Sequence, residues 1–195
     1  TSSYVAATTT NSFARLCSAD LPAASAFYNA TTGMGTQSRI FMNGEEAGNE
    51  GRAYAFIATG TSKGQAYELP KLGKMSWENS VANPYAGNKT IVIGLDDSTP
   101  GQVYVYSGNK TNTGSDIERA GLTNGKLYGM KVTVGGAPLA EEGALTALGG
   151  ATDTSTGSAG RFSLVAVGPA ATPGDVSSWN TGAQLTAAGG AEVVA

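Results

Sequence analysis

Three short acidic clusters are the strongest candidates for chemistry in this chain. They are Gly44-Glu45-Glu46, Trp77-Glu78-Asn79 and Leu95-Asp96-Asp97, and each lies at the edge of a short apolar run typical of a β-strand. Carboxylates that gather at one end of a sheet assembly repel one another unless a cation neutralises them, and a hard ion such as calcium is the usual partner. The clusters therefore predict a metal site.

Two of the clusters also have a simpler interpretation as turns. The Glu45-Glu46 pair follows a strand end, where solvated acidic residues are common. Asp96-Asp97 precedes Ser-Thr-Pro-Gly, where an aspartate often caps a turn through its own side chain. Glu78 is less easily explained, because a lone acid beside a tryptophan is costly to bury without a partner.

Composition excludes several classes of function. The chain has 195 residues, with 12 Lys+Arg against 15 Asp+Glu and no basic cluster, so nucleic acid is not an expected partner. It has no His and a single Cys, which excludes His-based zinc sites, Ser-His-Asp catalysis and an internal disulfide within the chain. Cys17 is expected to be a small buried apolar residue. No apolar run reaches the ~18 residues of a membrane helix. Any catalysis must use carboxylates, a metal ion or the backbone.

Charged residues make up only 14% of the chain and Gly numbers 28, a composition typical of secreted bacterial β-rich proteins. We therefore expect a secreted, periplasmic or cell-surface location. Three arginines, Arg52, Arg119 and Arg161, are candidate phosphate contacts by residue type alone and are expected to form surface ion pairs.

The strand pattern predicts an all-β fold. Short runs rich in β-branched and aromatic residues, separated by turn residues, occur at 39–42, 52–57, 65–69, 90–95, 102–106, 126–132 and 161–167. Their spacing indicates antiparallel meanders, as in a propeller or a sandwich, with short helical and loop insertions. We expect one domain over 1–195, with an irregular segment at 1–36, a β core at 37–133 and an Ala/Gly-rich segment with a strand at 134–195. Short helices are expected within 138–148 and 172–185.

Four elements occur in order over roughly residues 37–133. They are Gly44-Glu45-Glu46, Leu72-Gly73-Lys74-Met75-Ser76-Trp77-Glu78, Gly94-Leu95-Asp96-Asp97 leading to Tyr104-Val105-Tyr106, and Gly125-Lys126-Leu127-Tyr128. This set resembles the PhoX-type alkaline phosphatases, which have Cys-Glu-Glu, Leu-Gly-Arg-Phe-x-His-Glu, Gly-Asp-Asp with Tyr-x-Tyr/Phe, and Gly-x-Leu-Tyr elements in that order.

The resemblance implies a β-propeller, or part of a larger one, whose face carries a calcium-dependent, partly iron-containing cluster that hydrolyses phosphate monoesters. By position, Glu45 or Glu46, Glu78 and Asp97 would be metal ligands, and Asp96 would support or replace Asp97. The metal ions would bind the phosphate oxygens and position the attacking water or oxo group.

The chain departs from the family pattern at three places. Gly44 stands where the family has Cys, Trp77 stands where it has His, and its Arg-x-Glu-Asp element does not occur and would be expected just beyond Ala195. Calcium is therefore the expected cofactor, and iron is an alternative that the missing Cys disfavours.

Three functions remain open from the sequence. The first is an extracytoplasmic, metal-dependent phosphomonoesterase of the PhoX type. The alternative is a secreted structural or surface-assembly protein that retains the propeller scaffold without catalysis, because fold does not imply function. A carbohydrate-binding β domain is a third interpretation, based on exposed aromatic residues alone. Open sheet edges make self-association an expectation in each case.

Overall fold

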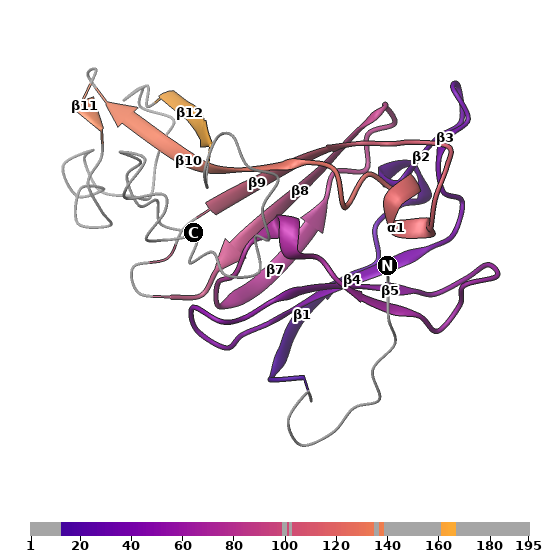
Figure 1. Ribbon diagram of the computed structural model, residues 1–195. Helices are drawn as coiled ribbons and strands as arrows, with labels where there is room; N and C mark the ends of the chain where they lie inside the picture. The colour runs from indigo at the N-terminus through magenta and orange to yellow at the C-terminus, as the bar shows by residue number, and fades with distance from the viewer. Residues whose placement is uncertain (1–12, 99–100, 102, 135–136, 139–160, 167–195) are drawn as a thin grey trace.

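Two main antiparallel β-sheets form the chain in the computed structural model, which describes residues 13–98, 101, 103–134, 137–138 and 161–166 (Figure 1). The first sheet has the strand order β1-β4-β5-β6. Its strands are β1 (Leu16–Asp20), β4 (Ile40–Glu45), β5 (Ala53–Ile57) and β6 (Ala66–Glu68). The last three form a meander, and β1 pairs with the open side of β4.

The second sheet is a longer meander with the order β11-β10-β9-β8-β7, and β12 also pairs with β10. Its strands are β7 (Trp77–Ala82), β8 (Lys89–Asp96), β9 (Val103–Asn109), β10 (Lys126–Val134), β11 (Ala137–Pro138) and β12 (Arg161–Ala166). In β8, every second residue from Thr90 to Asp96 is buried. This is the alternation expected of an antiparallel sheet that covers a core with one face.

Short elements gather beside the start of β4. They are the 3-10 helix η1 (Ala24–Ala26), the β2 (Tyr28–Asn29) and β3 (Met34–Gly35) ribbon, and the helix α1 (Asp116–Arg119). A second 3-10 helix, η2 (Pro70–Leu72), follows β6. A capping box between Ser115 and Glu118 begins α1 and satisfies its first backbone N–H groups. Figure 1 shows α1 beside β2 and β3.

The hydrophobic core lies between the sheets, where β1 and β4 lie against β7. Trp77 is 1% exposed and lies between two glycines, Gly44 of β4 and Gly94 of β8. A Cβ added at Gly44 would lie 2.3 Å from Trp77 Cβ, and one added at Gly94 would lie 2.6 Å from Trp77 Cζ3. The absence of side chains at these two positions is therefore what lets the indole fit between the sheets.

The observed architecture confirms the predicted all-β, antiparallel class. Each predicted strand occurs, with small shifts at its ends. The described part of the segment 1–36, which was expected to be irregular, contains the short elements β1, η1, β2 and β3. The helices expected within 138–148 and 172–185 lie outside the described residues, apart from Pro138, which ends β11. Within the described ranges, no helix has the length and apolar character needed to cross a membrane.

Candidate metal centre

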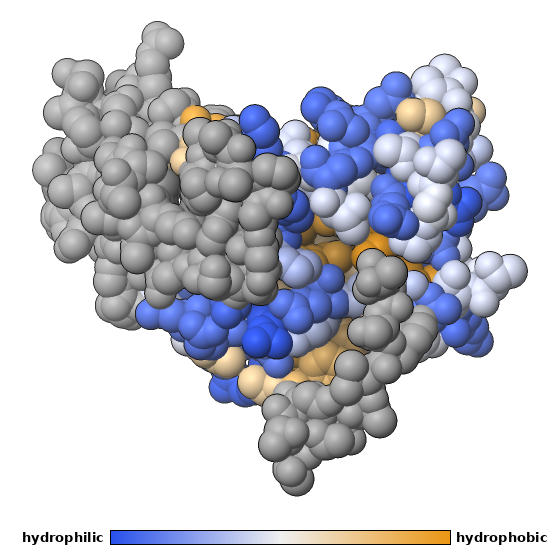
Figure 2. Space-filling model, in the orientation of Figure 1, coloured by the Kyte–Doolittle hydropathy of each residue, from blue (hydrophilic) through white to orange (hydrophobic). Residues whose placement is uncertain are grey.

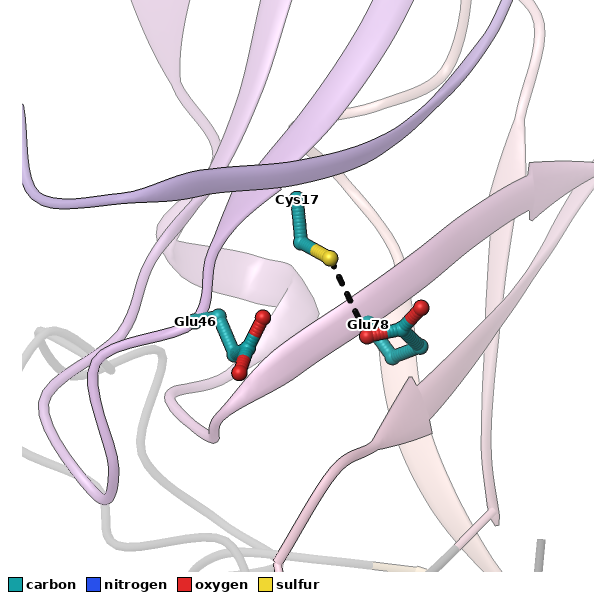
Figure 3. Close-up of side chains that lie close together, drawn as sticks. All are labelled: Cys17, Glu46 and Glu78. Carbon is teal, nitrogen blue, oxygen red and sulfur yellow. Dashed lines mark hydrogen bonds between the residues drawn. The ribbon is translucent and has the colours of Figure 1, made fainter.

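Three potential metal ligands from three parts of the chain meet where β1, β4 and β7 come together. They are Cys17, Glu46 and Glu78, and one ligand atom of each lies within 4.8 Å of the others. Figure 3 shows Cys17 pointing from β1 toward Glu78 on β7, with Glu46 reaching in from the segment that follows β4. In the described ranges, no other three Cys, Asp or Glu residues converge in this way. We call these three residues the thiol–carboxylate cluster.

Hydrogen bonds orient both oxygens of the Glu78 carboxylate. The Cys17 thiol donates to Glu78 Oε2 at 3.1 Å, and the Ser18 hydroxyl donates to Glu78 Oε1 at 3.2 Å. All three side chains are half-buried. The carboxylate is therefore held toward β1 while one side of the cluster stays open to solvent.

A guanidinium group neutralises the other carboxylate of the cluster. Arg15 forms an ion pair with Glu46 Oε2, and its side chain is 67% exposed against 15% for that of Glu46. The arginine thus covers the solvent side of the cluster without being buried in it. Glu46 Oε2 itself is buried, so the ion pair is exposed on the arginine side only.

Two irregularities in strand pairing position the cluster. In β7 and β8, Trp77 pairs with Asp96 and Asn79 pairs with Leu95, which leaves Glu78 as an extra residue. In β1 and β4, the register shifts between the Leu16 and Ala19 pairs, so Cys17 and Ser18 lie in the irregular stretch. A β-bulge re-aims a side chain away from the regular pleat. Here the two irregular stretches face each other across the junction of the sheets.

Strand alternation separates Glu46 from its neighbour Glu45. Consecutive residues of a strand point to opposite faces, and Gly44 faces Trp77 of β7. Glu46 continues the face of Gly44, whereas Glu45 points the other way and accepts a hydrogen bond from the Ala14 backbone N–H at 2.8 Å. Burial, with the nearby carboxylates of Glu45 and Glu68, raises the pKa of Tyr54 to about 12. Asn43 pairs with Tyr54 across β4 and β5, so Glu45, two residues further along β4, lies on the Tyr54 face of the first sheet.

The remaining predicted ligands also have other roles. Asp96 is buried and accepts hydrogen bonds from the Ser76 backbone N–H at 3.2 Å and from the Ser98 hydroxyl at 2.8 Å. Asp97 is exposed, and its backbone N–H donates to the Ser76 carbonyl. The structure therefore brings together Glu46 and Glu78, and it leaves Glu45, Asp96 and Asp97 outside the cluster.

Sequence reasoning missed Cys17, Ser18 and Arg15. Cys17 was expected to be a buried apolar residue, but it is half-buried and its thiol donates to a carboxylate 61 positions away. The one available signal is the polar surroundings of the only cysteine, in Arg15-Leu16-Cys17-Ser18-Ala19-Asp20. These neighbours argue against a core position.

The arginines singled out by residue type lie elsewhere. Arg52 pairs with Glu68 at 3.6 Å, and Arg119 pairs with Asp116 at 2.6 Å. The side chain of Arg161 lies outside the described part of the chain. Arg52 forms the expected surface ion pair, whereas Arg119 pairs with a buried carboxylate, and neither belongs to the cluster.

The donor set of the cluster fits a tetrahedral transition metal better than calcium. Ligand atoms bound to zinc at ~2.0–2.3 Å lie about 3.5 Å apart, so the observed spacing needs side-chain adjustments of only about 1 Å. Three protein ligands would leave a fourth position open, as in catalytic zinc sites. Calcium takes six to eight oxygens, and two carboxylates supply at most about four. The predicted calcium site stays untested, and the residues present favour an ion that accepts sulfur.

Comparisons with protein-family models, with curated proteins and with solved structures give no match for this chain. The resemblance to the PhoX-type phosphatases therefore stays a prediction from the sequence. The cluster has to be interpreted from its own geometry.

Proposed function

We propose that this chain is an extracytoplasmic, metal-dependent phosphomonoesterase whose metal centre is held by Cys17, Glu46 and Glu78. The observation that carries the proposal is the convergence of these three ligand types from β1, β4 and β7. The resemblance of the four ordered sequence elements to the PhoX-type family supplies the substrate class, a phosphate monoester. Zinc is the ion that we rank first, followed by iron and calcium.

Each residue of the site has a distinct task in this proposal. Glu46 and Glu78 hold the ion, and Cys17 gives up its proton to become the third ligand. Ser18 keeps the Glu78 carboxylate oriented through its hydrogen bond. Arg15 exchanges Glu46 for a phosphate oxygen, since a guanidinium binds phosphate and carboxylate with the same geometry. A bound metal ion would polarise the phosphate and activate a water molecule.

The proposal includes a propeller as the finer fold. Propeller blades are four-stranded antiparallel sheets. The first sheet has four strands, and β7 to β10 form a four-stranded meander. The contact of β1 and β4 with β7 would then be a contact between successive blades.

Metal binding is tested first, with the full chain freed of metal by a chelator. We expect Zn²⁺ at 100 times its dissociation constant to raise the free energy of unfolding by about 2.7 kcal/mol, measured by thermal or urea unfolding. Glu78→Gln removes one of the three ligands and should weaken zinc binding at least about 100-fold, more than is typical of residues outside the ligand set. Cys17→Ser should behave similarly.

The matched control is Glu50→Gln. Glu50 is an exposed carboxylate that pairs with Lys74, outside the cluster, so this variant should bind zinc like the unaltered chain. Parallel titrations with Ca²⁺ and Fe²⁺ rank the ions. The metal centre is ruled out if none of the three ions stabilises the chain, or if Glu78→Gln and Glu50→Gln respond alike.

Catalysis is tested separately with p-nitrophenyl phosphate. The metal-loaded chain should hydrolyse it, and Arg15→Ala should raise KM more than it lowers kcat, because Arg15 is assigned to substrate binding. Metal binding without hydrolysis would reject the phosphatase and retain the metal centre.

One observation favours the non-catalytic alternative, a secreted structural or surface-assembly protein. Glu46 is paired with Arg15, and Glu78 is hydrogen-bonded by Cys17 and Ser18, so both carboxylates already have partners without an ion. In that case, the thiol–carboxylate cluster would only stabilise the contact between β1 and β7. Cys17→Ser would then lower stability in the absence of metal, and added metal would have no effect.

A further inference from the structure

A polar pocket lies at the end of the molecule where β2, β3 and α1 gather. Its volume is about 380 Å³, near the lower end of the ~300–1,000 Å³ typical of small-molecule sites. Side chains with hydroxyl, amide or guanidinium groups line it: Tyr28, Gln37, Ser38, Thr61, Asn112 and Arg119. Figure 2 shows a mostly hydrophilic surface over this part of the molecule. The pocket is therefore suited to a small polar ligand.

Arg119 is fixed in the pocket wall by a buried carboxylate. Its Nη2 donates to Asp116 Oδ1 at 2.6 Å and to Thr36 Oγ1 at 3.3 Å. The Asp116 side chain is 2% exposed, whereas that of Arg119 is 36% exposed. Within the described residues, Arg119 Nε is buried without a hydrogen-bond partner, and Nη2 is the donor in both of the hydrogen bonds given above. The guanidinium group is thus held on one side, and the exposed part of the side chain lines the pocket.

The charge of the lining points to an anion. Arg119 is the one charged side chain among the described residues that line the pocket, and none of them is acidic. Asp116 lies behind the arginine and is already engaged by Thr36 and Arg119. A partly exposed guanidinium group in such a wall pairs well with a carboxylate or phosphate group. The neutral hydroxyls and amides around it suit hydroxyl groups, which both donate and accept hydrogen bonds.

The pocket is separate from the thiol–carboxylate cluster. Residues 36–38 of the pocket wall precede β4, whereas Glu46 follows it. A strand of the length of β4 (Ile40–Glu45) spans about 20 Å at ~3.3 Å per residue. A ligand of this volume therefore cannot touch both sites.

We propose that this pocket binds a small hydroxylated ligand carrying one oxyanion group, such as a sugar acid or a sugar phosphate. Arg119 binds the oxyanion, and Asn112, Thr61 and Gln37 bind the hydroxyl groups. Gly60 lines the pocket beside Ser38, whose Oγ would lie 2.4 Å from a Cβ at this position. The proposal does not depend on the phosphomonoesterase function.

Isothermal titration calorimetry on the full chain tests this with four probes: glucuronate, glucose 6-phosphate, glucose and inorganic phosphate. We expect one of the two anionic sugars to bind at least about 10-fold more tightly than glucose, because a hydrogen bond to a charged group typically changes affinity by about 10- to 100-fold. It should also bind more tightly than inorganic phosphate, which lacks hydroxyl-bearing carbons. The comparison of glucuronate with glucose 6-phosphate decides between a carboxylate and a phosphate.

Two variants assign the binding to this pocket. Arg119→Lys keeps a positive charge beside Asp116 and should weaken the anionic sugar about 10-fold or more, since a lysine lacks the planar fork. Asn112→Ala leaves the Asp116–Arg119 pair intact and should weaken the binding of the anionic sugar about 5-fold. Glu50→Gln, at an exposed residue outside both the pocket and the thiol–carboxylate cluster, is the control and should leave the affinity unchanged. Equal affinities for glucose and both anionic sugars, or unchanged affinity in Arg119→Lys and Asn112→Ala, would overturn the proposal.

Discussion

Gly44→Ala should destabilise the protein by about 3 kcal/mol, at the upper end of the range for overpacked cores. The new Cβ would lie 2.3 Å from Trp77 Cβ and 2.6 Å from Trp77 Cγ, whereas carbon atoms in contact are normally about 3.5–4.0 Å apart. The indole cannot retreat, because Gly94 holds its other edge equally closely. The strands β4 and β7 must therefore separate, which opens the core between the sheets.

Urea unfolding measures this effect, and Gly87→Ala is its matched control. A Cβ at Gly87 meets no atom within 4 Å, and its φ does not require glycine, so this variant should stay within about 0.5 kcal/mol of the unaltered chain. Similar midpoints for the two variants would mean that the sheets do not approach as closely as described.

The same close contact links the core to the candidate metal centre. Gly44 lies two residues before Glu46, and Trp77 directly precedes Glu78. Separating β4 from β7 would therefore move two of the three potential ligands apart. Gly44→Ala should lower both stability and zinc affinity, whereas Glu78→Gln should lower the zinc affinity with a much smaller loss of stability, that of a half-buried hydrogen bond.

Asp116→Asn should also cost about 3 kcal/mol at pH 7. Removing one partner of a buried ion pair typically costs 3–5 kcal/mol, and the half-exposed Arg119 places this pair at the lower end. The carboxylate accepts hydrogen bonds from the Thr36 hydroxyl at 2.5 Å and from Arg119 Nη2 at 2.6 Å. An asparagine supplies one oxygen and turns an amide donor toward groups that are themselves donors.

The dependence of stability on pH gives a second signature of Asp116. Burial opposes ionisation, but hydrogen bonds from Thr36, Ser62, Arg119 and Ser38 together lower the pKa of the Asp116 carboxyl below its usual 3.8. Between the folded-state pKa of Asp116 and its usual value of 3.8, the unfolded chain binds more protons than the folded chain. The contribution of Asp116 is therefore complete above pH 3.8 and is lost as the pH falls from 3.8 through the folded-state pKa.

Urea unfolding at several pH values between 2 and 7 measures this contribution. The free energy of unfolding should fall less steeply below pH 3.8 in Asp116→Asn than in the unaltered chain. Asp97→Asn is the control, because Asp97 is exposed and its replacement should leave the stability at pH 7 unchanged. If the free energy of unfolding falls with pH in parallel for the unaltered chain and Asp116→Asn, the pKa of Asp116 is not lowered in the folded protein.

The residue types within a segment were sufficient to predict the strands that are rich in β-branched residues. The run Thr90-Ile91-Val92-Ile93 predicts β8, because β-branched residues favour a strand regardless of what it pairs with. β7 was missed because Trp77-Glu78-Asn79-Ser80-Val81-Ala82 has no regular alternation, and its burial follows from contacts with β1 and β4. β1 was missed because Leu16-Cys17-Ser18-Ala19-Asp20 has no β-branched residue that would indicate a strand.

Two residues that depart from the family pattern have a packing role in the structure. Gly44 and Trp77, which stand where the resemblance expects Cys and His, are in direct contact, so they are parts of one packing arrangement. A thiol does lie near this junction, but it belongs to Cys17 of the neighbouring strand β1.

The sequence by itself determined the all-β class, most of the strands and two members of the candidate site, Glu46 and Glu78. It did so because residue types and their spacing set local backbone preference and mark unusual acidic positions. Tertiary structure alone decided which carboxylates meet and that Cys17 and Arg15 join them. The reason is that side-chain direction in a strand depends on register, and the register shifts near Cys17 and Glu78 arise from pairing between distant segments.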